Sequence, residues 1–452
     1  MADTRRSRRP DSDAQHPVER AVASVLRELL PSAPATGVAL SGGRDSIALL
    51  DALARVAAGV RVMAFHVHHG LSVQADAWTS FCRQACAERN VGFAVRNVHV
   101  DGKHHGVEAA ARAARYDALA ALAREHGVHD VLLAHHADDQ AETLLLQLIR
   151  GAGPRGLAAM PRIADERGVR WIRPFLSLPR ANIDDYADTH GLAFVDDESN
   201  GQTGYRRNAL RAEVVPALRT LAPGYPATLV RAARHQATSA QMLDDLAQID
   251  AGGAFDGRSL DAAILASLSV PRAQNLLRWF LRTQGLRAPS AVRLDAMLEQ
   301  LRAPRRDARI DFAHDRARVG LYRGRLLVHR RAPDAFHTPW NGAPEVQLAH
   351  GTLVFASTNG SGIAQRYLAH ARVTIRSGER GERLLPAGRM KRRAVADLLR
   401  EAGVPQWERI GLPRIYCGDA LAAVAQAGID ATFAALPGEA GLSFAWHPAA
   451  ID

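Results

Sequence analysis

The sequence has few cysteines and no long apolar segment, and both shortages exclude classes of protein. Among 452 residues, three are cysteine: Cys82, Cys86 and Cys417. Three thiols cannot form the dense disulfide framework of a small secreted domain. No apolar run approaches the roughly 20 residues that span a bilayer, so we expect no membrane anchor. Residues 1–10 carry four arginines with no apolar run after them. We therefore expect a cytoplasmic protein without a secretory signal.

Lysine is nearly absent, whereas arginine is abundant. The two lysines are Lys103 and Lys391, yet lysine and arginine together number 57 against 47 acidic residues, a formal net charge of +10. Such a surplus of positive charge favours a polyanionic partner such as nucleic acid. Heavy use of arginine can equally reflect a GC-rich genome, so the charge alone leaves the partner open.

Short apolar runs alternate with amphipathic segments in the first half of the chain. The runs are residues 37–40, 60–67, 93–100 and 130–135, and the helical patterns lie near 45–57, 75–90, 107–126 and 138–150. This alternation predicts an α/β domain at residues 18–218, a doubly wound parallel sheet with helices on both faces.

The remaining segments predict a tail and two further modules. Residues 1–17 are polar and charged, and we expect a disordered tail. Ala/Arg/Leu-rich patterns predict a mostly helical domain at 219–330. Residues 331–366 are rich in Pro, Gly, Asn and Ser, which favours a linker or a small β element. A strand pattern followed by a basic helix predicts a small α+β domain at 367–452.

A glycine-containing motif follows the first predicted strand and precedes the first helical pattern of the α/β domain. Its glycines let the backbone approach a bound anion, and the N–H groups and dipole of the helix attract phosphate. The lysine of an ordinary P-loop is missing, so this is a different kind of phosphate loop. The candidate nucleotide-binding residues are Ser41, Gly42, Gly43, Arg44, Asp45 and Ser46.

A second motif, LLAHHADDQAET at residues 132–143, follows another predicted strand. The carboxyl ends of parallel strands meet at one edge of a sheet, so this motif and the phosphate loop are expected to face one site. His135 and Asp139 are four residues apart at the entrance of a helix, a spacing that brings both side chains to that site. A transition-metal site is an alternative, and helix capping by Asp138 explains part of the pattern.

Two other groups of residues have both a functional and a structural interpretation. Alternation along a strand places His66 and His68 on one face, which fits a zinc site as well as ordinary structural histidines. Glu108, Arg112 and Arg115 share one face of a predicted helix. They are either site residues or a solvated ion pair. From these patterns we assign no metal ligands.

Taken in order, the motifs resemble those of the tRNA(Ile)-lysidine synthase family. The loop SGGRDS itself resembles the pyrophosphate loop of adenine-nucleotide α-hydrolases, which cleave ATP to AMP and pyrophosphate. The wider resemblance covers residues 37–218, and GERLLPAGRMKRRAVADLLREAGVPQWER resembles the family's last domain. The motifs within 37–218 are SGGRDS, HVHHGLSVQAD, EAAARAARY, LLAHHADDQAET, RGAGPRGLAAM, RPFLSLPRANI and DDESN followed by RRNALRAEVVPAL.

The resemblance implies a ligase that forms a carbon–nitrogen bond. The family uses ATP to adenylylate the C2 carbonyl oxygen of cytidine 34 in an isoleucine tRNA with a CAU anticodon. The amine of free L-lysine then displaces AMP to give lysidine. The expected cofactors are ATP and Mg²⁺, the expected partners are that tRNA and lysine, and a homodimer stays open.

Specific roles follow from the resemblance, residue by residue. Ser41 to Ser46 would bind the ATP phosphates, and Asp45 would help to place Mg²⁺ or the nucleotide. Arg115, His135 and Asp139 would activate the substrate and hold lysine, with acid, base and binding roles undivided among them. The domains at 219–330 and 367–452 would bind tRNA.

A basic cluster precedes the last helical pattern, and its residues are Arg389, Lys391, Arg392 and Arg393. Cations at the start of a helix oppose its dipole, so we expect an anion between them and propose a tRNA phosphate for that role. A solvated basic face is the alternative.

Two other functions compete with ligation of lysine. A tRNA thiolase of the same superfamily often carries a C-x-x-C pair, whereas Cys82 and Cys86 are spaced C-x-x-x-C on a predicted helix. There they are either two metal ligands or small buried apolar residues. A non-catalytic tRNA-binding protein would explain the charge but would not require the phosphate loop.

Overall fold

The computed structural model describes residues 15–30, 34–57, 59–68, 70, 74–98, 107–195, 206–302, 310–329, 334–387 and 389–449. It divides into two compact units, Met1–Met242 and Leu243–Asp452. Most of the tail predicted at 1–17 lies outside the described residues, and the first helix begins at Pro17. In the part of the chain that the structure describes, no helix is both long and apolar enough to cross a membrane.

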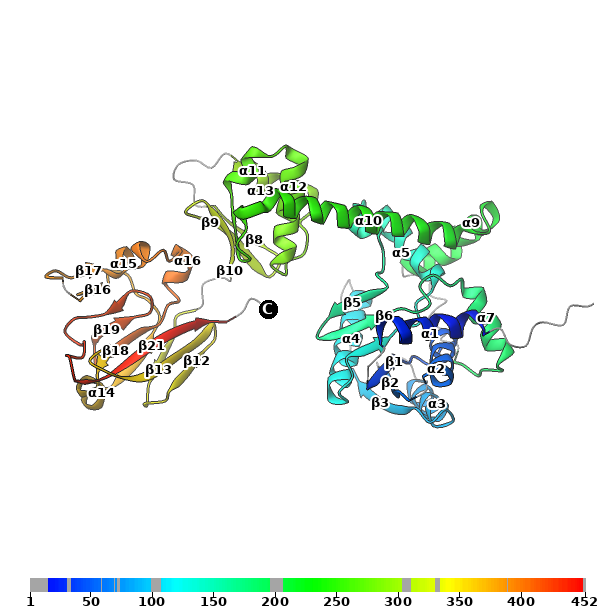
Figure 1. Ribbon diagram of the computed structural model, residues 1–452, viewed down its shortest axis with the longest axis horizontal. Coiled ribbons are helices and arrows are strands. Elements are labelled where there is room, and N and C mark those ends of the chain that lie inside the picture. Colours follow the sequence, from blue (N-terminus) through cyan, green and yellow to red (C-terminus); the bar gives the residue numbers. More distant parts are fainter. Residues whose placement is uncertain are drawn as a thin grey trace, which may run out of the picture. The chain divides into compact units, whose positions relative to one another are not determined.

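The first unit is built on a six-stranded sheet (Figure 1). Its strands are β1 (Ala35–Ala39), β2 (Arg61–His68), β3 (Gly92–Asn97), β4 (Asp130–Leu132), β5 (Ile163–Glu166) and β6 (Val169–Ile172). They lie in the order β3-β2-β1-β4-β6-β5, and all neighbours are parallel except the hairpin of β5 and β6. The parallel sheet predicted from the sequence is confirmed.

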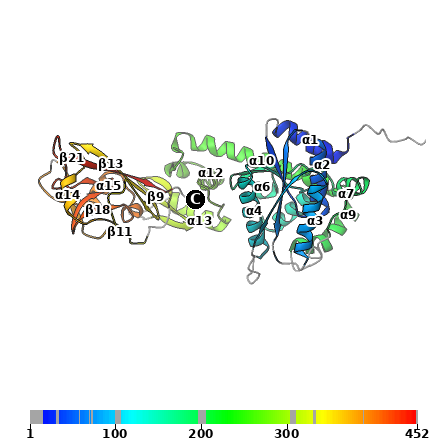
Figure 2. The same cartoon turned by 90° about the horizontal axis from the view of Figure 1, so that it is seen from below.

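Helices cover both faces of this sheet, as Figures 1 and 2 show. They are α1 (Pro17–Leu29), α2 (Arg44–Val56), α3 (Ala75–Ala87), α4 (Val107–Glu125), α5 (Ala137–Ile149) and α7 (Arg180–Thr189). One core joins α1, α2, α3 and α7 to the sheet, and the other joins α4 to the opposite face around the fully buried Phe65 and Trp171. Two separate apolar layers stabilise a doubly wound domain.

The order of the strands reverses at β1. From β1 the chain runs outward through β2 and β3, and it then returns to β4 on the other side of β1. Val38 of β1 therefore pairs with Ala64 on one side and Leu132 on the other. In open parallel sheets, ligands bind at the carboxyl ends of the strands at such a switch point. The crevice between β1 and β4 is where the site is expected.

Short helices complete the first unit and lead into a long one. They are α6 (Pro154–Leu157), α8 (Arg206–Ala209), the π-helical turn η2 (Leu210–Val214), α9 (Val215–Leu221) and α10 (Tyr225–Ala251). Ala141 of α5 packs with Val215 and Tyr225 in a small core. This core holds α9 and the start of α10 against α5, next to the switch point.

The second unit begins with helices packed on an antiparallel sheet. The helices are α11 (Ala263–Ser267), α12 (Val270–Thr283) and α13 (Ala291–Arg302), and the sheet contains β7 (Ser259–Asp261), β8 (Asp311–His314), β9 (Ala317–Tyr322) and β10 (Arg325–His329). Leu276, Phe280 and Met297 lie in the shared core. The segment predicted as mostly helical therefore also carries four strands.

Two further sheets form the end of the second unit. Their orders are β11-β15-β18-β19-β20 and β12-β13-β21-β14, beside a pair of β16 and β17. The strands are β11 (His337–Pro339), β12 (Glu345–Leu348), β13 (Gly351–Asn359), β14 (Ile363–Ala364), β15 (Val373–Arg376), β16 (Arg383–Leu384), β17 (Arg393–Ala394), β18 (Arg414–Cys417), β19 (Ala420–Val424), β20 (Gly428–Ile429) and β21 (Ala440–Pro448). The helices are α14 (Gln365–His370), α15 (Val395–Glu401) and α16 (Gln406–Arg409). Leu353 and Ile375, from different sheets, share one core. The segment interpreted as a linker or small β element forms β11 to β14.

An aromatic contact joins the two parts of the second unit. Trp407 of α16 packs over Gly320 of β9, where an added Cβ would lie 2.6 Å from the indole ring. The same ring stacks on His329 of β10, with centroids 4.3 Å apart and planes 9° apart. Glycine at position 320 is therefore required by a close approach and not by its own backbone conformation.

Candidate functional site

The phosphate loop connects β1 to α2 at the switch point. Gly42 has a φ of 90°, a conformation that favours glycine. A Cβ at this position would lie 3.1 Å from the Sγ atom of buried Cys82. Gly43 is the N-cap of α2 and supplies no side chain to cap it. The N-terminal dipole of α2 is therefore left for an external anion.

Side chains within the loop hold its shape. The Ser46 hydroxyl donates to the Gly43 carbonyl at 2.9 Å and accepts from the Ser41 backbone N–H at 3.2 Å. The backbone N–H of Val195 donates to the Gly42 carbonyl at 2.9 Å. Contacts within the chain therefore hold the backbone of the loop.

Two charged residues at the start of α2 have different surroundings. Arg44 donates to Asp184 of α7 at 2.5 Å and lies over the Phe194 ring, so its charge already has a partner. Asp45 has one buried carboxylate oxygen, Oδ1, without a hydrogen-bond partner. Burial raises the pKa of Asp45, although the charge of His136 opposes that rise.

The second motif begins α5 with a reciprocal cap. The His136 ring accepts from the Asp139 backbone N–H at 3.4 Å, and the Asp139 carboxylate accepts from the His136 backbone N–H at 3.1 Å. His136 therefore occupies the capping position that the sequence suggested for Asp138. Asp138 instead accepts a hydrogen bond from the Arg180 backbone N–H at 2.9 Å.

The other histidine of this motif is held neutral. Burial lowers the pKa of His135 well below its usual range. Its Nδ1 atom is buried and has no hydrogen-bond partner. A neutral imidazole has one acceptor nitrogen, so His135 offers an acceptor beside the phosphate loop.

Two acids and two arginines form a half-buried cluster behind His136. Arg207 reaches Asp139 Oδ1 at 2.8 Å and Glu142 Oε2 at 2.7 Å. Arg211 reaches the same aspartate oxygen at 3.2 Å and Glu142 Oε1 at 2.7 Å. Burial would raise the pKa of Asp139, but the charges of His136 and Arg207 lower it below its usual range. Each acid thus contacts both arginines.

Comparisons with known proteins match nearly the whole length of the chain. A PP-loop domain matches residues 14–218, a TilS substrate binding domain matches 260–327, and a TilS substrate C-terminal domain matches 373–446. A tRNA(Ile)-lysidine synthase from Ralstonia nicotianae is 41% identical over 95% of this chain and 96% of its own length. The synthase of the same name from Nitrosomonas europaea is 37% identical over 92% of both chains.

The chain belongs to the tRNA(Ile)-lysidine synthase family.

In this lysidine synthase family member, one matched segment lies in the first unit and the other two lie in the second. The PP-loop match spans the six-stranded sheet and ends in α9, and the other two fall on β7 to β10 and on β15 to β21. A PP-loop domain of this kind binds ATP. Among solved structures, the U34-tRNA thiolase NcsA from Methanococcus maripaludis is 18% identical with a TM-score of 0.41, covering 48% of this chain and 77% of that chain.

The structure brings some of the predicted residues of this lysidine synthase relative together. The loop Ser41–Ser46 and the motif with His135 and Asp139 meet at the switch point, where His136 Nε2 lies 3.8 Å from Asp45 Oδ2. Arg115 lies exposed on α4, and it is Arg112, three residues earlier, whose charge acts on His135. The predicted role of Arg115 remains a prediction.

Sequence reasoning did not single out His136, Glu142, Arg207 or Arg211. The available signals were the spacing of Asp139 and Glu142 on one helix face and the i, i+4 spacing of the two arginines. Neither spacing indicates that the two helices meet. The signals were therefore too weak to place these residues at the site.

The histidines and cysteines that also suggested metal sites have structural surroundings. His66 is buried and lies 2.8 Å from the Leu40 carbonyl oxygen, just before the phosphate loop. His68 contacts Asp76 at 3.1 Å. Burial raises the pKa of both Cys82 and Cys86 to about 12. Across the described ranges, no group of three or more His, Cys, Asp or Glu side chains is placed to hold a metal ion.

The basic cluster before α15 finds its anions within the chain. Arg392 pairs with Asp430 at 3.0 Å, and Asp430 is fully buried. Arg393 donates to Glu401 at 2.8 Å. The expectation that these two arginines need an external phosphate is therefore wrong, because carboxylates already compensate them. In the described part of the chain, Lys391 has no ion-pair partner.

Proposed function

We propose that this chain ligates free L-lysine to C2 of cytidine 34 in an isoleucine tRNA with a CAU anticodon. ATP first adenylylates the C2 oxygen of the cytidine, and lysine then displaces AMP to give lysidine. Family membership over almost the whole chain supports this function. The structural observation that carries it is the contact between Asp45 of the phosphate loop and His136, the cap of α5, whose Oδ2 and Nε2 atoms are 3.8 Å apart.

In this proposal the loop from Ser41 to Ser46 holds the phosphates of ATP. The uncapped end of α2 attracts their charge. The unpartnered oxygen of Asp45 suits Mg²⁺, which prefers carboxylate oxygens and substrate phosphates as ligands. Bound Mg²⁺ would neutralise charge that develops on pyrophosphate.

The first step forms a bond between the C2 oxygen of cytidine and the α-phosphorus of ATP, and it breaks the bond to pyrophosphate. Negative charge on the departing pyrophosphate faces the dipole of α2, which stabilises it. Arg44 is committed to Asp184. The backbone of the loop therefore carries most of this stabilisation.

The second step forms a bond between the lysine amine and C2 while the bond from C2 to the oxygen of AMP breaks. The amine must first lose a proton. His135 is neutral and its buried Nδ1 atom has no hydrogen-bond partner, so it is suited to orient the amine, whereas its lowered pKa makes it a poor acceptor of the proton itself. Asp139 and Glu142 suit an ammonium group, whereas Arg207 and Arg211 suit a carboxylate.

Ligation is tested by mass spectrometry of tRNA nucleosides. Purified protein is incubated with ATP, lysine and the isoleucine tRNA, and lysidine is expected in place of one cytidine. Omission of lysine should prevent the product. A thiolated nucleoside formed with a sulfur donor would favour the thiolase alternative. A protein that binds tRNA but shows no tRNA-dependent ATP–pyrophosphate exchange would be a non-catalytic binder.

The remaining modules act on tRNA in this proposal. The domains at 219–330 and 367–452 bind the body of the tRNA and bring its anticodon to the first unit. Their contribution should be electrostatic in part, because arginine–phosphate contacts release counterions and lose affinity as salt rises. The enzyme would act in the cytoplasm on tRNA and free lysine.

A further inference from the structure

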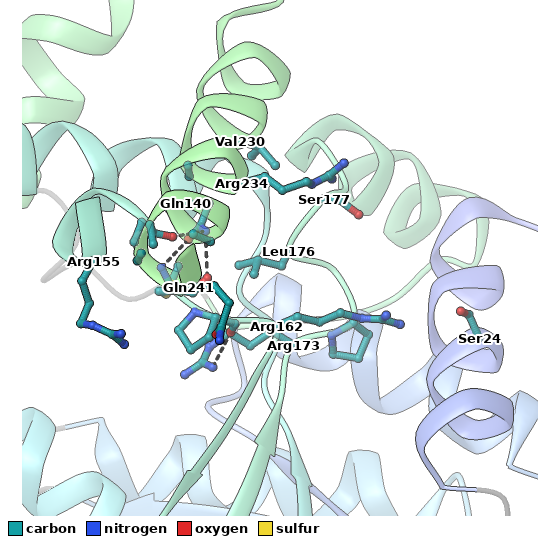
Figure 3. Close-up of a pocket in the computed structure, with 18 of the residues that line it drawn as sticks. Ser24, Gln140, Arg155, Arg162, Arg173, Leu176, Ser177, Val230, Arg234 and Gln241 are labelled. Carbon is teal, nitrogen blue, oxygen red and sulfur yellow. Dashed lines mark hydrogen bonds between the residues drawn. The ribbon is translucent and has the colours of Figure 1, made fainter. Parts of the chain in front are cut away.

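A cavity of 860 Å³ lies at the carboxyl end of β6 (Figure 3). Its walls come from α1, α5, residues 155–162, residues 173–177 and residues 230–241 of α10. No residue of the phosphate loop lines it. The cavity is thus separate from the nucleotide site, and its volume is within the usual range for small-molecule sites.

The lining of this cavity is positively charged. It includes Arg155, Arg162, Arg173 and Arg234 but a single acid, Glu28, which gives 4 − 1 = +3. In Figure 3, Arg155 and Arg234 lie on different walls, whereas Arg162 and Arg173 are neighbours at the end of the β5–β6 hairpin. Glu28 is already engaged by Arg162 at 3.2 Å and by Ser24 at 2.5 Å. Its charge is therefore not available to the remaining arginines.

Arg173 is the most deeply placed of these arginines. It is 6% exposed, and it donates to the Pro161 carbonyl at 2.8 Å. Its Nε atom is buried and has no hydrogen-bond partner. A buried guanidinium N–H without a partner is unfavourable, and an anion in the cavity would compensate it.

The cavity also adjoins the reacting groups. Gln140 follows Asp139 on α5 and lines the cavity, where it donates to the Met160 carbonyl at 2.8 Å and accepts from the Met160 backbone N–H at 2.9 Å. The charge of Arg173 contributes to lowering the pKa of His135. A ligand in the cavity would therefore lie next to the residues proposed to act on lysine and cytidine.

We propose that this cavity holds a phosphodiester group of the RNA strand beside the modified cytidine, with Arg173 as the inner ligand and Arg234 as the outer one. The assignment rests on the proposed function. It places the RNA strand that carries the cytidine in a cavity that no residue of the phosphate loop lines.

The alternatives to RNA fit the cavity less well. Free lysine carries a net charge of +1 at neutral pH, and a lining of +3 repels it. ATP has its own loop at α2. An RNA strand brings phosphates at regular spacing for arginines on several walls, and the apolar side chains of Met160, Leu176 and Val230 suit ribose and base faces.

Charge reversal on α10 tests the proposal with a matched control. Arg234 lines the cavity and is exposed, whereas Arg231, one turn earlier on α10, is exposed outside the lining. Arg234→Glu should raise the KM for tRNA about tenfold, because one phosphate contact becomes a repulsion. Arg231→Glu should change it less than about twofold. The KM for lysine and the rate at saturating tRNA should stay unchanged in both.

A second variant tests the inner ligand without adding charge. Arg173→Met removes the guanidinium and keeps most of the side-chain volume, so the melting temperature without tRNA should not fall markedly. Its KM for tRNA should rise as it does for Arg234→Glu. A selective rise in the KM for lysine would assign the cavity to the amino acid and overturn the proposal. Equal effects of Arg231→Glu and Arg234→Glu, or no effect of either, would overturn it as well.

The two proposals fail in different ways. If the wild-type protein forms no lysidine, the proposed function fails, and RNA binding is then measured directly by filter binding of the same tRNA. Weaker binding by Arg234→Glu than by Arg231→Glu would still support the cavity as an RNA site. Identical binding by both variants would overturn it.

Discussion

The Nε2 atom of His136 lies 3.8 Å from the Oδ2 atom of Asp45. The first residue caps α5 and the second lies in the first turn of α2. Their contact joins the phosphate loop after β1 to the charged cluster after β4. The phosphate loop and that cluster therefore meet at this contact.

Asp45→Asn should abolish tRNA-dependent ATP–pyrophosphate exchange, with a loss of at least about 100-fold. The protein without ATP should be as stable as the wild type or more stable. Burial raises the pKa of Asp45, so the charged carboxylate is disfavoured in the fold. Exchange is measured with labelled pyrophosphate and stability by thermal unfolding. The control is Asp76→Asn, whose side chain is fully exposed. Normal exchange by Asp45→Asn would show that the nucleotide site is misplaced.

Arg207→Met should destabilise the region around α5 by about 3 kcal/mol, because it leaves Asp139 and Glu142 sharing one arginine in a half-buried site. The effect should appear as faster amide hydrogen exchange in α5. Adding Asp139→Asn removes the excess negative charge and should restore part of the protection. If the double variant exchanges faster than the single one, charge balance does not explain the stability of this cluster.

Loss of stability in acid should depend on His135. Burial lowers its pKa from 6.5 to about 3, so the folded state favours the neutral ring. The stabilisation is present above the unfolded pKa and is lost as the pH falls from about 6.5 toward the folded value. His135→Asn should therefore show a smaller drop in melting temperature between pH 7.5 and pH 5 than the wild type. Exposed His129→Asn should behave like the wild type.

Lys391 and Arg392 should respond differently to charge reversal. Lys391→Glu should raise the KM for tRNA about threefold without loss of stability, because this exposed lysine makes no ion pair in the described structure. Arg392→Glu should lower the melting temperature, because it places an acid beside fully buried Asp430. The KM for ATP is measured for both variants and for the wild type, and it should not change. A rise in that KM would mean that the last domain supports the catalytic unit.

Gly320→Ala should loosen the contact between the two parts of the second unit. The added methyl group would lie 2.6 Å from the ring of Trp407, so the indole must move away from His329. Shifted tryptophan emission and a lower melting temperature are expected. Combining Gly320→Ala with Trp407→Leu should recover part of the loss. Unchanged tryptophan emission from Gly320→Ala would show that the Trp407 indole does not pack against Gly320 in solution.

The elements of the first unit were predictable because their signals are local. The phosphate loop lies between a short apolar run and an amphipathic segment, and strand β2 and helix α2 fall within one residue of the expected ranges. The choice between His135 and His136 was not predictable. The two residues are identical and adjacent, and only the direction in which α5 begins decides that the His136 ring caps the helix and the His135 ring does not.

Ion pairs between residues far apart in the sequence were also not predictable from it. Glu142 and Arg211 lie on helices whose approach depends on the small core around Ala141. The partner of Arg392, Asp430, follows in the sequence only after several intervening strands. A spacing rule describes one helix or one strand at a time. It therefore cannot show that a basic cluster is neutralised by an acid from another element.

The thiol of Cys82 lies directly beneath Gly42 of the phosphate loop. Oxygen atoms added to this sulfur would clash with the turn at Gly42, which forms part of the proposed ATP site. Oxidants react with thiolates, however, and burial raises the pKa of this thiol to about 12. At the pH of a cell nearly all of Cys82 is protonated, so the nucleotide loop should keep its shape during oxidative stress that inactivates enzymes with exposed, acidic thiols.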